Sequence, residues 1–302
     1  MDKEKLGTML ALLAAVISGF AIPVNKIFVV DLDPTVFTAV RAIIIGVVFL
    51  VLSVLNSRFS LRNMKQMDWK YLLSIAFIGG SFAFLLFFTG LKFTTGGRAA
   101  FLHKTLPLYA AIFAFVFLRE KIPRRQIYAL IIMLVGTLML FSAQINPSGL
   151  WINPQLGDAL VLGATVLWAL ENVISRKVML RGGSNFFVSF ARMFFGGVIL
   201  FGFAALIGRF DVLFSLSAQQ WGNIFISALI LFGYVLFWYW SIRHINVSKA
   251  SSLLLLAPVV SLVAGVLWLR EPAPNLQLIG SALILVGAYF VAGIKSRFLT
   301  GA

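Results

Sequence analysis

Ten apolar runs of about 20 residues follow one another along the 302-residue chain and limit its possible folds more than any other feature. A helix rises 1.5 Å per residue, so each run can cross a hydrocarbon core about 30 Å thick. Hydrophobic residues make up 61% of the chain and charged residues 12%, and no segment is left over for a soluble domain. The sequence therefore predicts an all-α membrane protein with ten transmembrane helices. The expected spans are 6–29, 34–56, 70–91, 95–118, 126–143, 156–178, 186–208, 222–243, 247–269 and 275–294.

The basic residues lie mostly in short loops and favour one side of the membrane. The loops and tails on the side of the N-terminus carry 17 of the 25 Lys and Arg residues, the opposite side carries five, and three lie inside the expected spans. By the positive-inside rule, both termini are expected in the cytoplasm of a multi-pass protein of the plasma membrane. Contacts with lipid explain the formal charge of +15, and nucleic acid is not an expected partner because no contiguous basic face is present.

Several classes of protein are disfavoured by what the sequence lacks. The chain has no Cys and two His residues, so a thiolate metal site, a disulfide or a thiol nucleophile is not available. The phosphate-binding pattern GxxxxGK[ST] does not occur, which argues against ATP-driven transport by this chain alone. We expect no catalytic residues, no metal and no cofactor.

The chain repeats itself with a shift of 151 residues. Without a gap, this shift aligns FLREK (117–121) with WLREP (268–272), LVG (134–136) with LVG (285–287), Pro107 with Pro258 and Arg41 with Arg192. Shared Leu and Val would be expected of any two apolar sequences, but matches of Pro, Arg-Glu and Gly in one register are not.

The repeat predicts two five-helix units, residues 1–150 and 151–302. Because five is an odd number, the second unit enters the membrane from the opposite side to the first. Inverted repeats of this kind place a substrate site near the midplane between the halves and expose it alternately to the two sides. The architecture by itself therefore indicates a transporter.

Four segments carry a resemblance to a known family. An Arg lies early in the second helix of each repeat (TAVRAIIIG and FARMFFGG), and the fourth helix of each repeat ends in PLYAAIFAFVFLRE or PVVSLVAGVLWLRE. With ten spans in two repeats, the sequence resembles the EamA family of the drug/metabolite transporter superfamily. This resemblance implies that helices one to four and six to nine surround a central cavity and that the fifth and tenth are peripheral. It also implies export or import of amino acids, other metabolites, nucleotide-linked sugars or drugs.

Two charged residues fall in the middle of expected spans. Lys104 lies deep in the fourth helix and Glu171 in the sixth, and a charge at such depth needs a partner or a water-filled cavity. We expect these two residues to pair with each other. The repeat aligns Lys104 with Leu255 and Glu171 with Phe20, so these charges belong to one copy only, as a site for an asymmetric solute allows. A purely structural buried ion pair is the alternative.

Other polar and aromatic residues share these helices. His103 and Asn172 adjoin the charged pair, Trp168 shares a helix face with Glu171, and Tyr234 and Trp238 could form aromatic walls or belong to an interfacial belt. We include all five as candidate substrate-binding residues. His103 is as well explained by a hydrogen-bonded bystander as by a proton carrier.

The remaining features are assigned to the scaffold. Pro107 and Pro258 free the carbonyl four residues earlier and are expected to bend their helices near the midplane as hinges. Arg41 and Arg192 are expected to snorkel or to pair with a neighbouring helix end. A further expectation concerns Gly280 and Gly287, which lie on one face of the last helix and would allow close packing or a homodimer.

The sequence thus predicts a secondary transporter for a small polar or zwitterionic organic solute, such as an amino acid or related metabolite. Lys104 would engage a carboxylate or other anionic group. Glu171 would be its counter-ion in the empty site and would otherwise hold an amine or a coupling proton; the protein could be proton-coupled or an exchanger. The alternatives are a non-transporting membrane receptor or assembly factor and a membrane-embedded enzyme that uses His103, Lys104 and Glu171. The enzyme is disfavoured because neither a metal cluster nor an activated nucleophile is visible.

Overall fold

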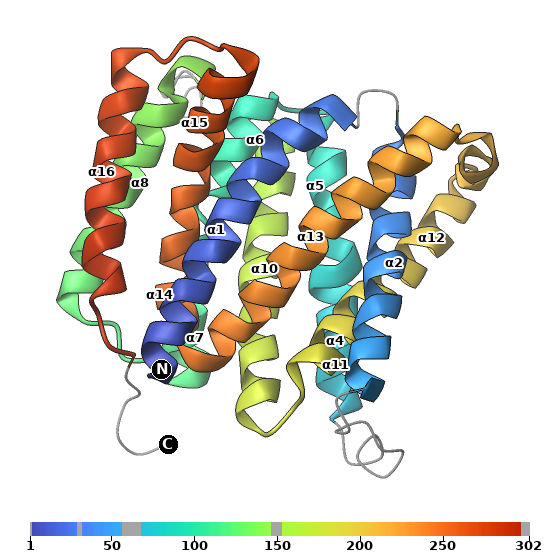
Figure 1. Ribbon diagram of the computed structural model, residues 1–302, viewed down its shortest axis with the longest axis horizontal. Coiled ribbons are helices and arrows are strands. Elements are labelled where there is room, and N and C mark those ends of the chain that lie inside the picture. The colour runs from blue at the N-terminus through green and yellow to red at the C-terminus, as the bar shows by residue number, and fades with distance from the viewer. Residues whose placement is uncertain (1, 29–31, 56–67, 146–152, 297–302) are drawn as a thin grey trace.

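A computed structural model describes residues 2–28, 32–55, 68–145 and 153–296. Within these residues the chain forms ten helical spans long and apolar enough to cross a membrane, and it contains no strand (Figure 1). Each expected span overlaps one of them, so the predicted fold class is confirmed. The boundary expected at residues 150 and 151 lies outside the described residues.

Four of the spans are interrupted and six are continuous. The continuous spans are α1 (Lys3–Phe28), α2 (Pro34–Leu55), α8 (Arg124–Ile145), α10 (Leu156–Leu180), α13 (Ala218–His244) and α16 (Asn275–Ala292). The third and seventh spans each contain one π-helical turn. The third consists of α4 (Trp69–Phe77), the π-helical turn η1 (Ile78–Phe82) and α5 (Ala83–Leu91). The seventh consists of α11 (Asn185–Phe190), the π-helical turn η2 (Ala191–Phe195) and α12 (Gly196–Leu206). The fourth and ninth are broken: α6 (Gly96–His103) and α7 (Leu106–Leu118); α14 (Val247–Leu253), η4 (Leu254–Leu256) and α15 (Ala257–Leu269). A 3-10 turn, η3 (Phe210–Ser215), precedes α13.

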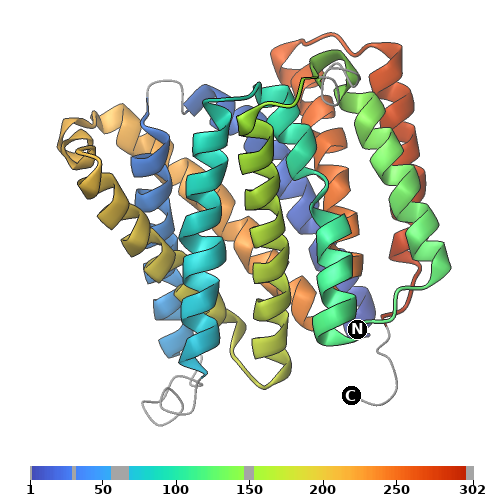
Figure 2. The same cartoon turned by 180° about the vertical axis from the view of Figure 1, so that it is seen from behind.

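The helices pack in matching pairs, as an inverted repeat requires. α1 packs along α13, and its counterpart α10 packs along α4, η1 and α5, as Figure 2 shows from behind. α2 packs against its own counterpart α12. The two last helices of the repeats, α8 and α16, pack against each other at one end of the molecule (Figure 1, left). The fifth and tenth spans are therefore peripheral, and the others surround the centre.

The glycine face of the last helix is used inside the chain. A Cβ placed on Gly280 would lie 2.5 Å from the carbonyl oxygen of Gly136 on α8, and one on Gly287 would lie 2.9 Å from that of Ala129. Close packing of α16 against α8 thus explains these glycines. The homodimer stays a prediction without support from this face.

Both broken spans are interrupted just before the repeat-related prolines. Pro107 and Pro258 stand at the second residue of α7 and α15, where a missing N–H costs no helical hydrogen bond. In the first copy the chain tightens into a turn, in which Thr105 Oγ1 donates to the carbonyl oxygen of Leu102 at 2.6 Å. The expected interruptions of the two helices are present, and movement about them stays a prediction.

The fourth span of each repeat ends in the same backbone geometry. Arg119 and Arg270 adopt left-handed conformations with φ of 53° and 54°, respectively. The following residues, Glu120 and Glu271, donate their N–H groups to the carbonyls of Ala114 and Gly265 at 3.1 and 3.2 Å. These are helix-terminating bonds that span six residues, placed 151 positions apart. The duplication thus extends to individual dihedral angles and hydrogen bonds.

Candidate functional site

A cavity of about 210 Å³ lies between the two repeats. Helices α1, α2, α5, α6 and α7 of the first repeat and α10, η2 and α13 of the second contribute to its lining. The lining residues of α1, from Ser18 to Asn25, belong to the half of that helix away from the N-terminus. The cavity therefore lies in the middle and in the half of the bundle opposite the chain termini.

Five of the seven predicted substrate-binding residues line this cavity. They are His103, Trp168, Asn172, Tyr234 and Trp238. Lys104 and Glu171 are not among the lining residues. That the five bind a solute stays a prediction.

Aromatic rings form the cavity walls, and the N–H groups of the two indoles are already hydrogen-bonded within the protein. The imidazole of His103 packs on the Trp168 indole, with ring centroids 5.0 Å apart. Trp168 Nε1 donates to the carbonyl oxygen of Gly79 at 3.0 Å, and Trp238 Nε1 donates to Asn172 Oδ1 at 2.8 Å. Tyr234 stacks on Trp238 at 6.3 Å between centroids. With their N–H groups engaged, the indoles offer apolar faces to a bound molecule.

The predicted pair of Lys104 with Glu171 is wrong. Glu171 is fully buried, and its Oε1 accepts hydrogen bonds from Ser175 Oγ at 2.6 Å and from Tyr239 Oη at 2.5 Å. Its Oε2 lies 3.4 Å from Nε of Arg192, which is the cation that neutralises it. The described residues contain no ion pair of Lys104, which is half-buried and stands at the C-terminal cap of α6, where a positive charge suits the exposed carbonyls.

The π-helical turns explain how Arg192 reaches Glu171. Arg192 lies in η2, and the wider turn changes the face that the following residues present. On the facing helix, η1 supplies Gly79, where an added Cβ would overlap Cγ of Glu171. The absence of a side chain at Gly79 therefore gives the carboxylate its place. The same turn brings Gly80 against Gly196, with an added Cβ on Gly196 2.6 Å from Cα of Gly80.

Arg41 and Arg192 neither snorkel to the membrane surface nor pair with a helix end, so the expectation for them is wrong. Both are buried, at 8% and 9% exposure, and both line the cavity. Arg41 Nη1 donates to Ser227 Oγ at 2.9 Å, and Ser227 Oγ donates to Asn25 Oδ1 at 2.6 Å. The signal that could have found them was an arginine repeated at the same register in two otherwise apolar helices.

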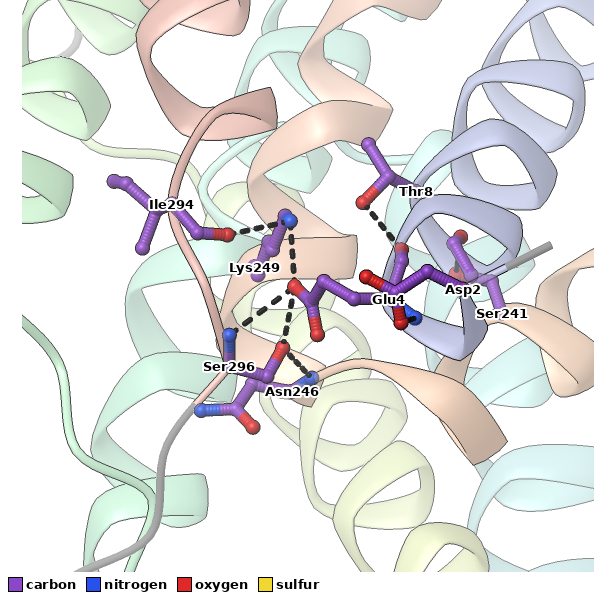
Figure 3. A network of polar contacts seen from close by, with 9 residues as sticks. Asp2, Glu4, Thr8, Ser241, Asn246, Lys249, Ile294 and Ser296 are labelled. Carbon is purple, nitrogen blue, oxygen red and sulfur yellow. Dashed lines mark hydrogen bonds and ion pairs between the residues drawn. The ribbon is translucent and has the colours of Figure 1, made fainter.

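A buried ion pair joins two helices at each end of the bundle. At the end that holds the termini, Lys249 of α14 is buried and donates to Glu4 of α1 at 2.8 Å (Figure 3). The same carboxylate oxygen accepts bonds from the backbone N–H and the hydroxyl of Ser296. At the opposite end, Arg98 of α6 pairs with Asp158 of α10 at 2.7 Å. The shift of 151 residues relates Arg98 to Lys249, so the basic members of the two pairs are repeat-related.

A further contact is present at one end only. Glu120, which follows α7, is fully buried and accepts bonds from the N–H groups of Val247 and Ser248 at 2.8 and 3.2 Å and from Ser248 Oγ at 2.9 Å. Burial raises the pKa of the Glu120 carboxyl above its usual value, although these bonds and the charge of Arg176 act in the opposite direction. Glu271, its repeat counterpart, is exposed.

The packing of the helix halves follows the same asymmetry. α7 packs against α14 at the end of the termini, whereas α6 and α15, their counterparts at the opposite end, are not among the packed pairs of the described residues. The space around Gly96, the counterpart of Val247, is open: an added Cβ would meet no atom within 4 Å. Within the described residues, the fourth and ninth helices therefore pack closely against each other at one end only.

Comparison with known proteins gives a consistent result. The chain is 26% identical to the uncharacterized transporter YoaV of Bacillus subtilis, over 92% of this chain and 94% of that protein. It is 28% identical to an uncharacterized transporter of Archaeoglobus fulgidus, over 90% of this chain and 94% of that protein. A crystal structure with 18% identity superposes with a TM-score of 0.75, covering 95% of this chain and 98% of the other, which establishes likeness of fold alone.

A family model matches the chain twice, at residues 5–142 and 155–293, in keeping with the two repeats of the structure. The relatives carry the name of transporters, and the ten apolar helices make the chain a multi-pass membrane protein. The chain belongs to the EamA-like transporter family.

Proposed function

We propose that this protein is a secondary transporter that moves a small organic solute, such as an amino acid or related metabolite, across the plasma membrane by alternating access. In this proposal both termini are cytoplasmic, as the distribution of Lys and Arg favours. The end closed by Glu120 is then the cytoplasmic end, and the cavity lies toward the outside.

One observation carries the proposal. The repeat-related glutamates that follow the fourth and the ninth helix differ in burial. Glu120 is fully buried at the start of α14, whereas its counterpart Glu271 is exposed. In an inverted repeat, exchanging the conformations of the two halves produces the opposite state. In that state Glu271 would cap α6 at Gly96 and Gly97, and Glu120 would leave α14.

The natural absence of cysteine provides a direct test. A single Ser18→Cys substitution places one thiol in the cavity, and a membrane-impermeant maleimide is applied to oriented vesicles from either side. We expect labelling from both sides, with Glu120→Ala raising the rate from the cytoplasmic side and lowering it from the outside. Labelling from one side only, unchanged by Glu120→Ala, would contradict alternating access.

Flux in proteoliposomes separates the transporter from its alternatives. Saturable uptake of radiolabelled metabolites without chemical change supports the transporter, whereas a product without flux indicates an enzyme. Binding without either indicates a receptor.

We also propose that Glu171 carries the coupling proton if flux follows a pH gradient. The carboxylate lies behind the cavity and reaches it through Arg192, which lines the wall. Glu171→Gln is expected to abolish the response of uptake to an imposed pH gradient, and an unchanged response would rule out this residue. Tyr239→Phe, which removes one hydrogen bond and leaves the carboxylate, is the matched control.

A further inference from the structure

We infer that the cavity selects an organic anion and that the guanidinium of Arg41 binds its carboxylate. This inference rests on the proposed transport function and narrows its substrate from a polar or zwitterionic solute to a carboxylate without a compensating positive charge. The reasoning starts from the charges in the cavity wall.

The described lining residues include two arginines and no acidic side chain. Arg192 is neutralised by Glu171 at 3.4 Å. For Arg41 the described contacts are the Ser227 hydroxyl and the face of Phe37, 4.1 Å from Cζ to the ring centroid. Neither of these groups carries a charge, so the cavity contains one cation that is not neutralised from within the described wall.

Burial makes this arrangement costly unless a ligand compensates it. Arg41 is 8% exposed, and its Nε has no hydrogen-bond partner among the described residues. A buried charge without a counter-ion and a buried donor without an acceptor both destabilise the empty site. A carboxylate supplies the charge and the acceptors together, because its two oxygens match the planar fork of a guanidinium.

The neighbouring side chains hold Arg41 in place and leave its remaining donors available. The hydroxyl of Ser227 gives its proton to Asn25 Oδ1, so its oxygen is free to accept from Arg41 Nη1. This chain of bonds fixes one edge of the guanidinium against α13. A solute that enters from the cavity can then meet the other donors without moving the arginine.

A zwitterion would find no acidic partner for its ammonium group among the described lining residues. Glu171 is fully buried behind the wall, and its carboxylate is engaged by Ser175, Tyr239 and Arg192. The rest of the wall offers the aromatic faces of Phe84, Trp168 and Trp238, which suit an apolar or aromatic body. A volume of about 210 Å³ is below the roughly 300 Å³ at which drug-sized pockets begin, which points to a small metabolite.

Ligand binding to the purified protein tests the inference with matched probes. Benzoate, butyrate and succinate are compared with benzamide, butyramide, benzylamine and phenylalanine by thermal unfolding and by tryptophan fluorescence, since two tryptophans line the cavity. We expect at least one carboxylate to bind and its amide, benzylamine and phenylalanine to bind at least about tenfold more weakly. Equal binding of the amide, tighter binding of phenylalanine, or binding of phenyl phosphate in place of every carboxylate would overturn the inference.

Variants of Arg41 assign the effect to this residue. Arg41→Gln is expected to weaken carboxylate binding about tenfold or more, and Arg41→Lys to retain part of it. Arg124→Gln, an exposed arginine at the start of α8, is the control and is expected to change nothing. If Arg41 only stabilises the fold, Arg41→Gln lowers the unfolding temperature of the ligand-free protein and leaves the preference for anions intact, which would contradict the inference.

Failure of the inference and failure of the proposed function give different results. Flux that does not prefer anions, or that Arg41→Gln leaves unchanged, overturns the anion site and keeps the transporter. Carboxylate binding that depends on Arg41, with no flux of any probe, supports the site and overturns transport.

Discussion

At the end of the bundle that holds the termini, Glu120 is buried against the start of α14, whereas at the opposite end its counterpart Glu271 is exposed. The backbones that present these two carboxylates are the same, with left-handed arginines and six-residue terminating bonds in both copies. The difference therefore lies in how the neighbouring half-helices approach, and not in the local structure of either end. Two ends with the same local structure and different contacts agree with the alternating access that we propose.

The largest effect is expected from breaking the buried ion pairs. Glu4→Gln leaves Lys249 buried without its carboxylate, and Asp158→Asn does the same to Arg98 at the other end. Each is expected to destabilise the folded protein by about 3 kcal/mol, seen as a lower unfolding temperature. Only Glu4→Gln is expected to open the cavity toward the side of the termini in the Ser18→Cys labelling assay.

The control for both variants is Asp68→Asn. Its carboxylate pairs with Arg181 at 3.2 Å, but both side chains are about half exposed, at 45% and 55%. Such surface pairs contribute less than about 1 kcal/mol. An equally large loss of stability in Asp68→Asn would show that burial does not distinguish the pairs.

Substitution of the repeat-related glutamates is expected to have the next largest effect on stability. Glu120→Ala leaves the Val247 and Ser248 donors unsatisfied and is expected to cost the closed state about 1–3 kcal/mol. Glu271→Ala, at an exposed position, is expected to change the stability of this state by less than about 0.5 kcal/mol. Hydrogen exchange at the start of α14 measures the difference, and equal effects would remove the asymmetry between the ends.

A pH dependence of closure is expected from Glu120. Its buried carboxyl has a raised pKa, so the closed state binds a proton more readily than a state in which the carboxyl meets water. Closure is therefore strongest below the usual pKa of about 4.3 and weakens as pH rises through the raised pKa. The cytoplasmic labelling rate of Ser18→Cys should rise over this window relative to the same reporter in Glu120→Gln. The same rise in both backgrounds would assign the effect to another group.

The smallest effect is expected at the left-handed residues that end the fourth and ninth helices. At residues 119 and 270, glycine is expected to give a protein about 1 kcal/mol more stable than alanine, because a left-handed backbone suits glycine. Comparing glycine with alanine cancels the loss of each arginine side chain. Thermal unfolding of the four variants should give the same difference at both positions; a difference at one position only would show that the two caps are not equivalent.

The sequence could predict the helices, the repeat and the two interruptions because each follows from composition or from proline chemistry. The apolar runs determine the spans. Pro107 and Pro258 mark the interruptions, because proline has no N–H to donate to the preceding helical turn. Five of the candidate residues also reach the cavity, since they lie on helices that surround the centre.

The ion pair could not be predicted in the same way. Position along a helix gives the depth of Lys104 and Glu171, but pairing also depends on the direction in which each side chain points. A π-helical turn at η2 and the missing side chain of Gly79 bring Arg192 to Glu171, and neither feature follows from hydrophobic periodicity. Position along the helix also gave a wrong expectation for Arg41. Its bond to Ser227, and the bond of Ser227 to Asn25, join three different helices.

The contact between Gly80 and Gly196 has a mechanical consequence. Here the third helix of the first repeat and the second helix of the other repeat, which is the seventh of the chain, touch backbone to backbone with no side chain between them. Side chains that interlock must change rotamers when helices tilt, and a contact without side chains has none to change. If the two halves tilt against each other, as the proposed transport requires, this contact is expected to persist without repacking of side chains.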